Sequence, residues 1–129
     1  MRARITITIL GVLAAAALVA VPTAGAATNV HTATLKGSAA FPAVTGSAKF
    51  SVDDGIRQLE AEIQHAKPLA GTNVRFRVDG VLVGTAKVNA LGTARINKSG
   101  SAVPAVHTGS TIRVRRASNG ALVASGTFN

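Results

Sequence analysis

Apolar and polar residues alternate along most of the chain beyond residue 26, with Val, Ile and Thr in the runs and Gly, Pro, Asn and Asp between them. A period of two is typical of β-strands with one buried face. It predicts eight short strands, over residues 33–38, 47–52, 57–65, 73–78, 81–88, 93–97, 111–116 and 121–128. Strands of this number and spacing favour an antiparallel β-sandwich of immunoglobulin-like size, with a small β-barrel as the alternative.

Glycine-containing turns are predicted to connect two of these strand pairs. Asp79-Gly80 separates two apolar runs, and both positions of such a two-residue turn need positive φ. The sequence Ser118-Asn119-Gly120 fits a three-residue loop with Gly120 in the left-handed conformation. That loop length implies two opposed pairs, Val114 with Ala124 and Arg116 with Leu122.

The first 26 residues have the three parts of a secretory signal helix. Arg2 and Arg4 precede an apolar run of 17 residues, and small residues follow at Ala24 to Ala26. The run is shorter than the roughly 20 residues that span a bilayer, so we expect a cleaved signal rather than an anchor and no stable membrane span after processing. Cleavage within Ala24 to Thr28 then leaves one domain, residues 27–129, that is secreted, extracellular or cell-wall associated.

Composition changes this picture in two ways. The chain has no cysteine, so neither disulfides nor thiolate chemistry are available and packing alone must hold the fold. Removal of the signal takes two of the fourteen basic residues, which leaves twelve basic residues against five acidic ones and a net charge of +7. A basic exported domain is expected to meet anionic partners.

Acidic residues in the third predicted strand suggest partners for two of the arginines. If residues 57–65 form a hairpin with residues 73–78, the register that places Ile63 and Leu59 on the core side puts Glu62 opposite Arg75 and Glu60 opposite Arg77. Exposed pairs of this kind contribute only about 0.2–1 kcal/mol each, so they would act mainly on register and solubility.

The remaining basic residues have no carboxylate in a matching position. They form the candidate binding patch of the sequence: Arg113, Arg115, Arg116, Arg95 and Lys98. The alternative interpretation is that these side chains are simply the solvated face of an alternating strand.

Catalytic and metal chemistry are not indicated. His31, His65 and His107 lack the spacing of metal ligands, and no nucleophile motif or phosphate-binding glycine loop is present. Nucleic acid is not expected as a partner, because single-strand binding needs stacking aromatics and the four phenylalanines are the only aromatic residues. We therefore expect no enzyme activity, no cofactor and no metal.

Two partial resemblances accompany these patterns. The stretch LKGSAAFPAVTGSAKFSVDDGIRQLEAEI, residues 35–63, resembles the first half of chordin-type extracellular repeats. Residues 33–128 are similar to small secreted bacterial all-β proteins that have V-x-V-x-G-x-x-V-G-T hairpins and a terminal SGTF strand, most without an assigned function. Both resemblances imply an extracellular β-domain, and neither carries a catalytic residue onto this chain.

An internal repeat links the two arginine-rich strands. GTNVRFRV, residues 71–78, matches GSTIRVRR, residues 109–116, and a duplication and a recurrent way of entering a strand explain the match equally well. Together these observations predict a non-enzymatic extracellular or cell-surface module that binds an anionic cell-wall polymer through basic residues. The alternative is a small secreted inhibitor or protein-binding module that uses the loop at residues 103–110 to contact another extracellular protein.

Overall fold

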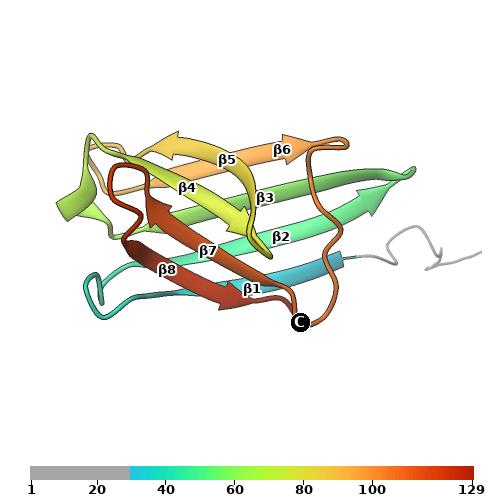
Figure 1. Ribbon diagram of the computed structural model, residues 1–129, viewed down its shortest axis with the longest axis horizontal. Coiled ribbons are helices and arrows are strands. Elements are labelled where there is room, and N and C mark those ends of the chain that lie inside the picture. Colours follow the sequence, from blue (N-terminus) through green and yellow to red (C-terminus); the bar gives the residue numbers. More distant parts are fainter. Residues whose placement is uncertain (1–29) are drawn as a thin grey trace, which may run out of the picture.

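Eight antiparallel strands form one nearly closed sheet in the computed structural model, which describes residues 30–129 (Figure 1). The strands are β1 (Val30–Gly37), β2 (Thr45–Asp53), β3 (Ile56–Gln64), β4 (Asn73–Val78), β5 (Val81–Lys87), β6 (Ala94–Ser99), β7 (Thr111–Arg116) and β8 (Leu122–Thr127). The described part of the chain contains one 3-10 turn, η2 (Lys67–Leu69), and no α-helix. The all-β prediction is confirmed, and every predicted strand is found within three residues of its predicted ends. The predicted signal lies outside the described residues.

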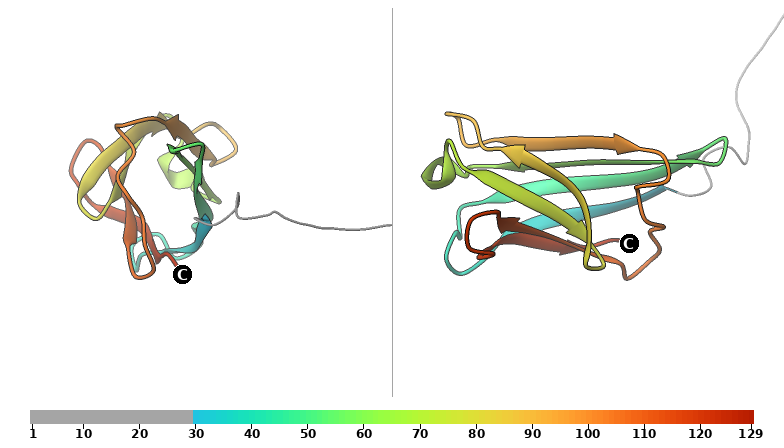
Figure 2. Two further views of the ribbon diagram at one scale, coloured as in Figure 1. Left: turned by 90° about the vertical axis from the view of Figure 1, so that its right-hand side faces the viewer. Right: turned by 45° about the horizontal axis from the view of Figure 1, so that its top comes forward.

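The sheet closes on itself through side chains instead of a last set of backbone hydrogen bonds. Its order is β5-β4-β7-β8-β1-β2-β3-β6, so β5 and β6 are the two outer strands. The end-on view in Figure 2 shows these strands completing a ring, which fits the small-barrel alternative. At the seam, Gly84 leaves room for neighbouring side chains, because a Cβ there would lie 3.1 Å from both Ile96 Cγ2 and Lys98 Cε.

The core fills the inside of this ring. Alternation gives each strand an inward row, and the largest fully buried side chains include Phe76, Phe128, Leu35, Leu59 and Ile63. Connecting segments cover the two ends: Leu69 of η2 is 1% exposed at one end, and Val103 of the loop before β7 is 0% exposed at the other. Arg57 Nη1 donates to the Val103 carbonyl at 2.9 Å and fixes that loop.

The predicted pairing of residues 57–65 with residues 73–78 is wrong. Strand β3 pairs with β2 and β6, whereas β4 pairs with β5 and β7. The cause is a second two-residue turn, in which Asp54 and Gly55 have φ of 51° and 76° and fold β3 back onto β2. Segment η2 then carries the chain away from β3, so β4 begins on another part of the ring (Figure 1).

The predicted ion pairs of Glu62 with Arg75 and of Glu60 with Arg77 are therefore wrong as well. Glu62 lies between Ser47 and Arg95 on the neighbouring strands. Glu60 lies between Lys49 and Asn97.

The predicted turns are confirmed, whereas the predicted pairing of Arg116 with Leu122 is wrong. Asp79 and Gly80 have φ of 49° and 83°, and Gly120 has φ of 72°. Val114 lies opposite Ala124 as predicted. Arg116, however, donates its backbone N–H to the Ala121 carbonyl. Leu122 instead lies opposite Arg115, because a β-bulge in this hairpin shifts the register by one residue.

Gly46 in β2 is required by the close approach of β3. A Cβ at this position would strike the Glu62 carbonyl oxygen and lie 3.1 Å from Ile63 Cα, both backbone atoms that cannot move aside. We expect Gly46→Ala to lower the free energy of unfolding by about 1–3 kcal/mol, as overpacking does in well-packed interiors. Urea unfolding checks this, with Ser47→Ala, at an exposed position of the same strand, as the control. Equal stability of the two variants would contradict the close approach.

Candidate functional site

Four arginines meet on the outer surface of β4 and β7, which lie side by side in Figure 1. Arg75 lies directly opposite Arg115, and Arg77 lies directly opposite Arg113. The residues that alternate with them, Val74, Phe76, Val78, Ile112 and Val114, are fully buried, so strand alternation directs all four arginines outward. We call these four residues the arginine face.

Two of the four guanidinium groups are held by backbone carbonyls of nearby turns. Arg77 Nη1 donates to the Gly80 carbonyl at 3.3 Å, and Arg115 Nη1 donates to the Gly120 carbonyl at 3.0 Å. Arg75 and Arg113 are exposed, and neither makes a side-chain hydrogen bond or ion pair among the residues that the structure describes. The face thus presents two fixed and two free cations.

Acidic residues are placed away from this face. Four of the five lie on the β2–β3 hairpin, namely Asp53, Asp54, Glu60 and Glu62. In the sheet order, β8 and β1 separate that hairpin from β7 on one side, and β6 and β5 separate it from β4 on the other. The fifth, Asp79, lies at the edge of the face in the β4–β5 turn, where Oδ1 accepts the backbone N–H of Thr111 at 3.0 Å. The arginine face therefore keeps its positive charge.

A small depression lies within the face. It has a volume of about 120 Å³ and is lined by Arg77, Gly80, Thr111, Arg113 and Arg115. Its three guanidinium groups are positively charged and offer only hydrogen-bond donors, and the threonine hydroxyl can donate as well, the combination that recognises oxyanions. On the same outer surface, Lys36 of β1 extends the row of Arg77 and Arg113 beyond Ser125 of β8.

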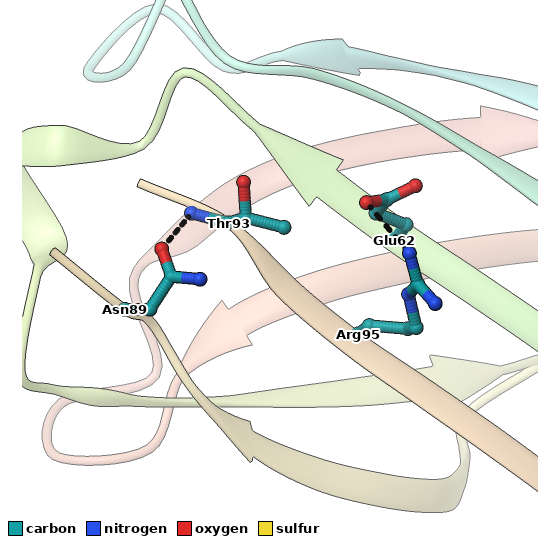
Figure 3. Close-up of polar contacts among 4 residues, drawn as sticks. All are labelled: Glu62, Asn89, Thr93 and Arg95. Carbon is teal, nitrogen blue, oxygen red and sulfur yellow. Dashed lines mark hydrogen bonds and ion pairs between the residues drawn. The ribbon is translucent and has the colours of Figure 1, made fainter. Parts of the chain in front are cut away.

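The basic residues predicted from the sequence do not form one patch. Arg113 and Arg115 belong to the arginine face, whereas Arg95 and Lys98 lie on β6. Arg95 Nη2 is 3.5 Å from Glu62 Oε2 (Figure 3), the one ion pair found within residues 30–129. Lys98 lies at the β5–β6 seam.

Arg116 is half-buried at the end of β7, on the inward side opposite Val74. Its Nε is buried and has no hydrogen-bond partner in the structure.

The patch predicted from the sequence also lacks Arg75 and Arg77, because the predicted register gives these two arginines carboxylate partners. The repeat GTNVRFRV and GSTIRVRR was the signal that could have placed them correctly, since it marks β4 and β7 as equivalent strands with equivalent arginines.

A second and larger recess lies over β1, β2, β3 and β6. It has a volume of about 440 Å³, and its lining alternates cationic, anionic and neutral polar groups, with Lys49 opposite Glu60 and Arg95 opposite Glu62. Beyond its edge, Asn89 Oδ1 accepts the backbone N–H of Thr93 at 3.0 Å and holds the turn before β6 (Figure 3). Because its charges are already matched, this recess has no net attraction for an ion.

A serine, a histidine and an aspartate gather beside the β6–β7 loop, but not in a catalytic arrangement. Ser110 is 1% exposed, and its hydroxyl accepts the backbone N–H of His107 at 3.1 Å. The His107 ring instead lies 3.0 Å from the Thr108 carbonyl through Nδ1. The His107 ring is therefore not placed to take a proton from this buried hydroxyl, as a serine–histidine pair requires. In the described part of the chain no three His, Cys, Asp or Glu residues are placed to hold a metal ion.

Comparisons with known proteins add no family to this description. No model of a known protein family matches the chain, and a search of curated proteins finds no match. No helix within residues 30–129 has the length and apolar character needed to cross a membrane.

The opposed arginines should repel one another measurably. We expect Arg75→Glu to raise the free energy of unfolding by about 1 kcal/mol at low salt, because it replaces a like-charge pair with an opposite-charge pair facing Arg115. Urea unfolding in low and in high salt checks this, and the gain should shrink in high salt. The control is Lys67→Glu, which makes the same change of charge at an exposed site off the face. An equal gain from both variants would show that only net charge matters.

The Asp79 carboxylate should make stability depend on pH in the acid range. The backbone N–H of Thr111 lowers the pKa of Asp79 from its ordinary value. Desolvation of the carboxylate raises this pKa, but the Ser110 hydroxyl lowers it further, so the net shift is downward. A carboxyl group with a lower pKa in the folded state stabilises the fold above its unfolded pKa of about 3.9, and this contribution is lost as the pH falls through the folded pKa.

We therefore expect Asp79→Asn to flatten the loss of stability below about pH 4, measured by urea unfolding from pH 2 to pH 6. Asn tolerates the positive φ of this turn position, so the turn should be kept. Asp53→Asn, which removes an exposed carboxylate at the end of β2, is the matched control. An Asp79 variant with the same acid profile as the unmodified protein would contradict this role.

Proposed function

We propose that this protein is exported by its N-terminal signal and acts as a non-enzymatic extracellular or cell-surface module that binds an anionic surface polymer through the arginine face. Wall teichoic acid and acidic polysaccharides are polymers of the required charge. The observation that carries the proposal is the pairing of Arg75 with Arg115 and of Arg77 with Arg113, without an acidic side chain between them.

Energetics favour a ligand at this position. Like charges directly opposite each other on a sheet reduce stability, and the fold contains two such pairs side by side. A polyanion lying on the face would relieve the repulsion and release its own counterions, which makes binding stronger at low salt. A surface of this kind also steers charged partners toward it.

The loop at residues 103–110 supports the alternative protein-binding function less well. Val103 and Val106 are 0% and 7% exposed, and Ser110 is buried, so much of the segment packs onto the core. The Gly109 N–H donates to the Phe128 carbonyl, which fixes the end of the loop. The exposed residues that remain in the segment are Ala105 and the short stretch from His107 to Gly109.

Salt-dependent binding to purified wall teichoic acid tests the proposal. We expect the protein to bind the polymer at low salt and the fourfold variant Arg75→Gln, Arg77→Gln, Arg113→Gln, Arg115→Gln to bind it much more weakly. The slope of log K against log salt is negative, and it should become less steep by about 3 in the variant, since each neutralised phosphate contributes roughly −0.7 to −0.9. Isothermal titration calorimetry at several salt concentrations measures both quantities.

The matched control changes four basic residues off the face, Lys49, Lys67, Arg95 and Lys98, to glutamine. It has the same net charge as the first variant, and all four positions are exposed. We expect this control to keep most of the affinity. Equal losses in the two variants would mean that net charge, and not the arginine face, holds the polymer.

A further inference from the structure

The arginine face is organised by a local two-fold axis. The repeated segments GTNVRFRV and GSTIRVRR equate each residue of β4 with the residue 38 positions later in β7. Phe76 lies directly opposite Val114, which is its own equivalent in the repeat. Antiparallel strands that pair about equivalent residues are related by a two-fold axis normal to the sheet, here passing between Phe76 and Val114. Arg75 and Arg113 are thus equivalent, as are Arg77 and Arg115.

Hydrogen bonds at the two ends of this strand pair obey the same symmetry. The Asp79 N–H donates to the Thr111 carbonyl, and the Ala117 N–H donates to the Asn73 carbonyl, both at 2.9 Å. Each bond is the symmetry mate of the other, because 73 corresponds to 111 and 79 to 117.

The flanking hairpins are equivalent too. Strand β5 beside β4 and strand β8 beside β7 both shift register at the same point of the repeat, after Phe76 in one hairpin and after Val114 in the other. Leu82 lies opposite Arg77, and Leu122 lies opposite Arg115. The symmetry therefore extends over four neighbouring strands.

The symmetry also sorts the arginines into two kinds. Arg77 and Arg115, one equivalent pair, each donate to the carbonyl of a turn glycine that follows their own strand. Arg75 and Arg113, the other pair, are exposed and keep all their donors for a ligand. These two lie on a diagonal of the sheet, for which the spacing of neighbouring strands gives about 7–8 Å.

We propose that Arg75 and Arg113 bind two successive phosphodiester groups of a base-free phosphodiester chain, such as a polyol phosphate. This inference rests on the proposed function and names the chemistry of its polymer. Arginine presents a planar fork to the two free oxygens of a phosphodiester, and the depression beside Arg113 adds the Thr111 hydroxyl. Two equivalent arginines suit two chemically identical anionic groups, which successive units of such a chain supply.

Polymer architecture distinguishes phosphodiesters from carboxylates here. Phosphodiester groups lie in the chain itself, so a straight chain passes its charges along one line of the face. Carboxylates of an acidic polysaccharide project from the sides of successive rings and do not follow one line. Nucleic acids share the phosphodiester group, but base binding needs exposed aromatic rings, and Phe50, Phe76 and Phe128 are all buried.

Substitutions that conserve charge test the inference. The double variant Arg75→Lys, Arg113→Lys removes the two guanidinium groups that have no protein partner within the described part of the chain. The double variant Arg77→Lys, Arg115→Lys removes the two guanidinium groups that are already bonded to carbonyls. Affinity for poly(glycerol phosphate) should fall about tenfold or more in the first variant and by less than about threefold in the second. Poly-glutamate and oligothymidylate with the same number of charges are the comparison ligands, and we expect both to bind more weakly than poly(glycerol phosphate).

The outcomes distinguish failure of the phosphodiester assignment from failure of the proposed function. Equal binding of poly-glutamate and poly(glycerol phosphate), with no effect of either lysine variant, would overturn the phosphodiester assignment and leave anionic binding by the face intact. Tighter binding of oligothymidylate would overturn the base-free assignment. No binding of any polyanion would refute the proposed function itself.

A measurement on the unmodified protein avoids dependence on variants that fold poorly. Titration with poly(glycerol phosphate) should shift the arginine Nε–Hε NMR signals of Arg75 and Arg113 more than those of Arg77 and Arg115. Shifts of equal size in all four would contradict the division into free and held arginines.

Discussion

The pairing of β4 with β7, with Phe76 opposite Val114, is the constraint on which the rest of this molecule depends. Both side chains are fully buried in the core, and the alternation of a strand then places the arginines on either side of them outward. Core and basic surface are thus fixed by one register. A slip by one residue would turn Arg75 and Arg77 into the core and expose Phe76, so the buried side chains protect the arrangement of the charged ones.

Local pattern and turn chemistry were enough to predict the strands but not the order of the sheet. A period of two depends on neighbouring residues, so the bounds of β4 and β7 could be predicted from the sequence alone. The choice of partner strand is nonlocal. The requirement that apolar residues of two paired strands share the core side led to the pairing of residues 57–65 with residues 73–78, but any antiparallel neighbour can meet it. The turn at Asp54-Gly55 held the decisive signal, because it has the same form as Asp79-Gly80 and assigns β3 to β2.

Errors at the candidate site have the same origin. The pairing of β3 with β4 that the sequence predicts gives Arg75 and Arg77 carboxylate partners, whereas in the structure they lie opposite Arg115 and Arg113. The bulge in the β7–β8 hairpin is a second feature that the sequence does not predict. The inserted residue shifts the pairing of the residues beyond it, so Leu122 lies opposite Arg115, and a bulge leaves no clear mark in composition. The repeat carried the missing information, but only a known pairing shows that its two copies face each other.

The β5–β6 seam has a consequence for behaviour at high concentration. Unpaired strand edges are templates on which other copies of a chain add as further strands. Here the two outer edges of the sheet are turned toward each other and covered by Ile96 and Lys98 packed over Gly84. An open sheet of the same strands would offer both edges to solvent. By curling until its edges meet, the molecule gains resistance to aggregation without needing a last row of hydrogen bonds.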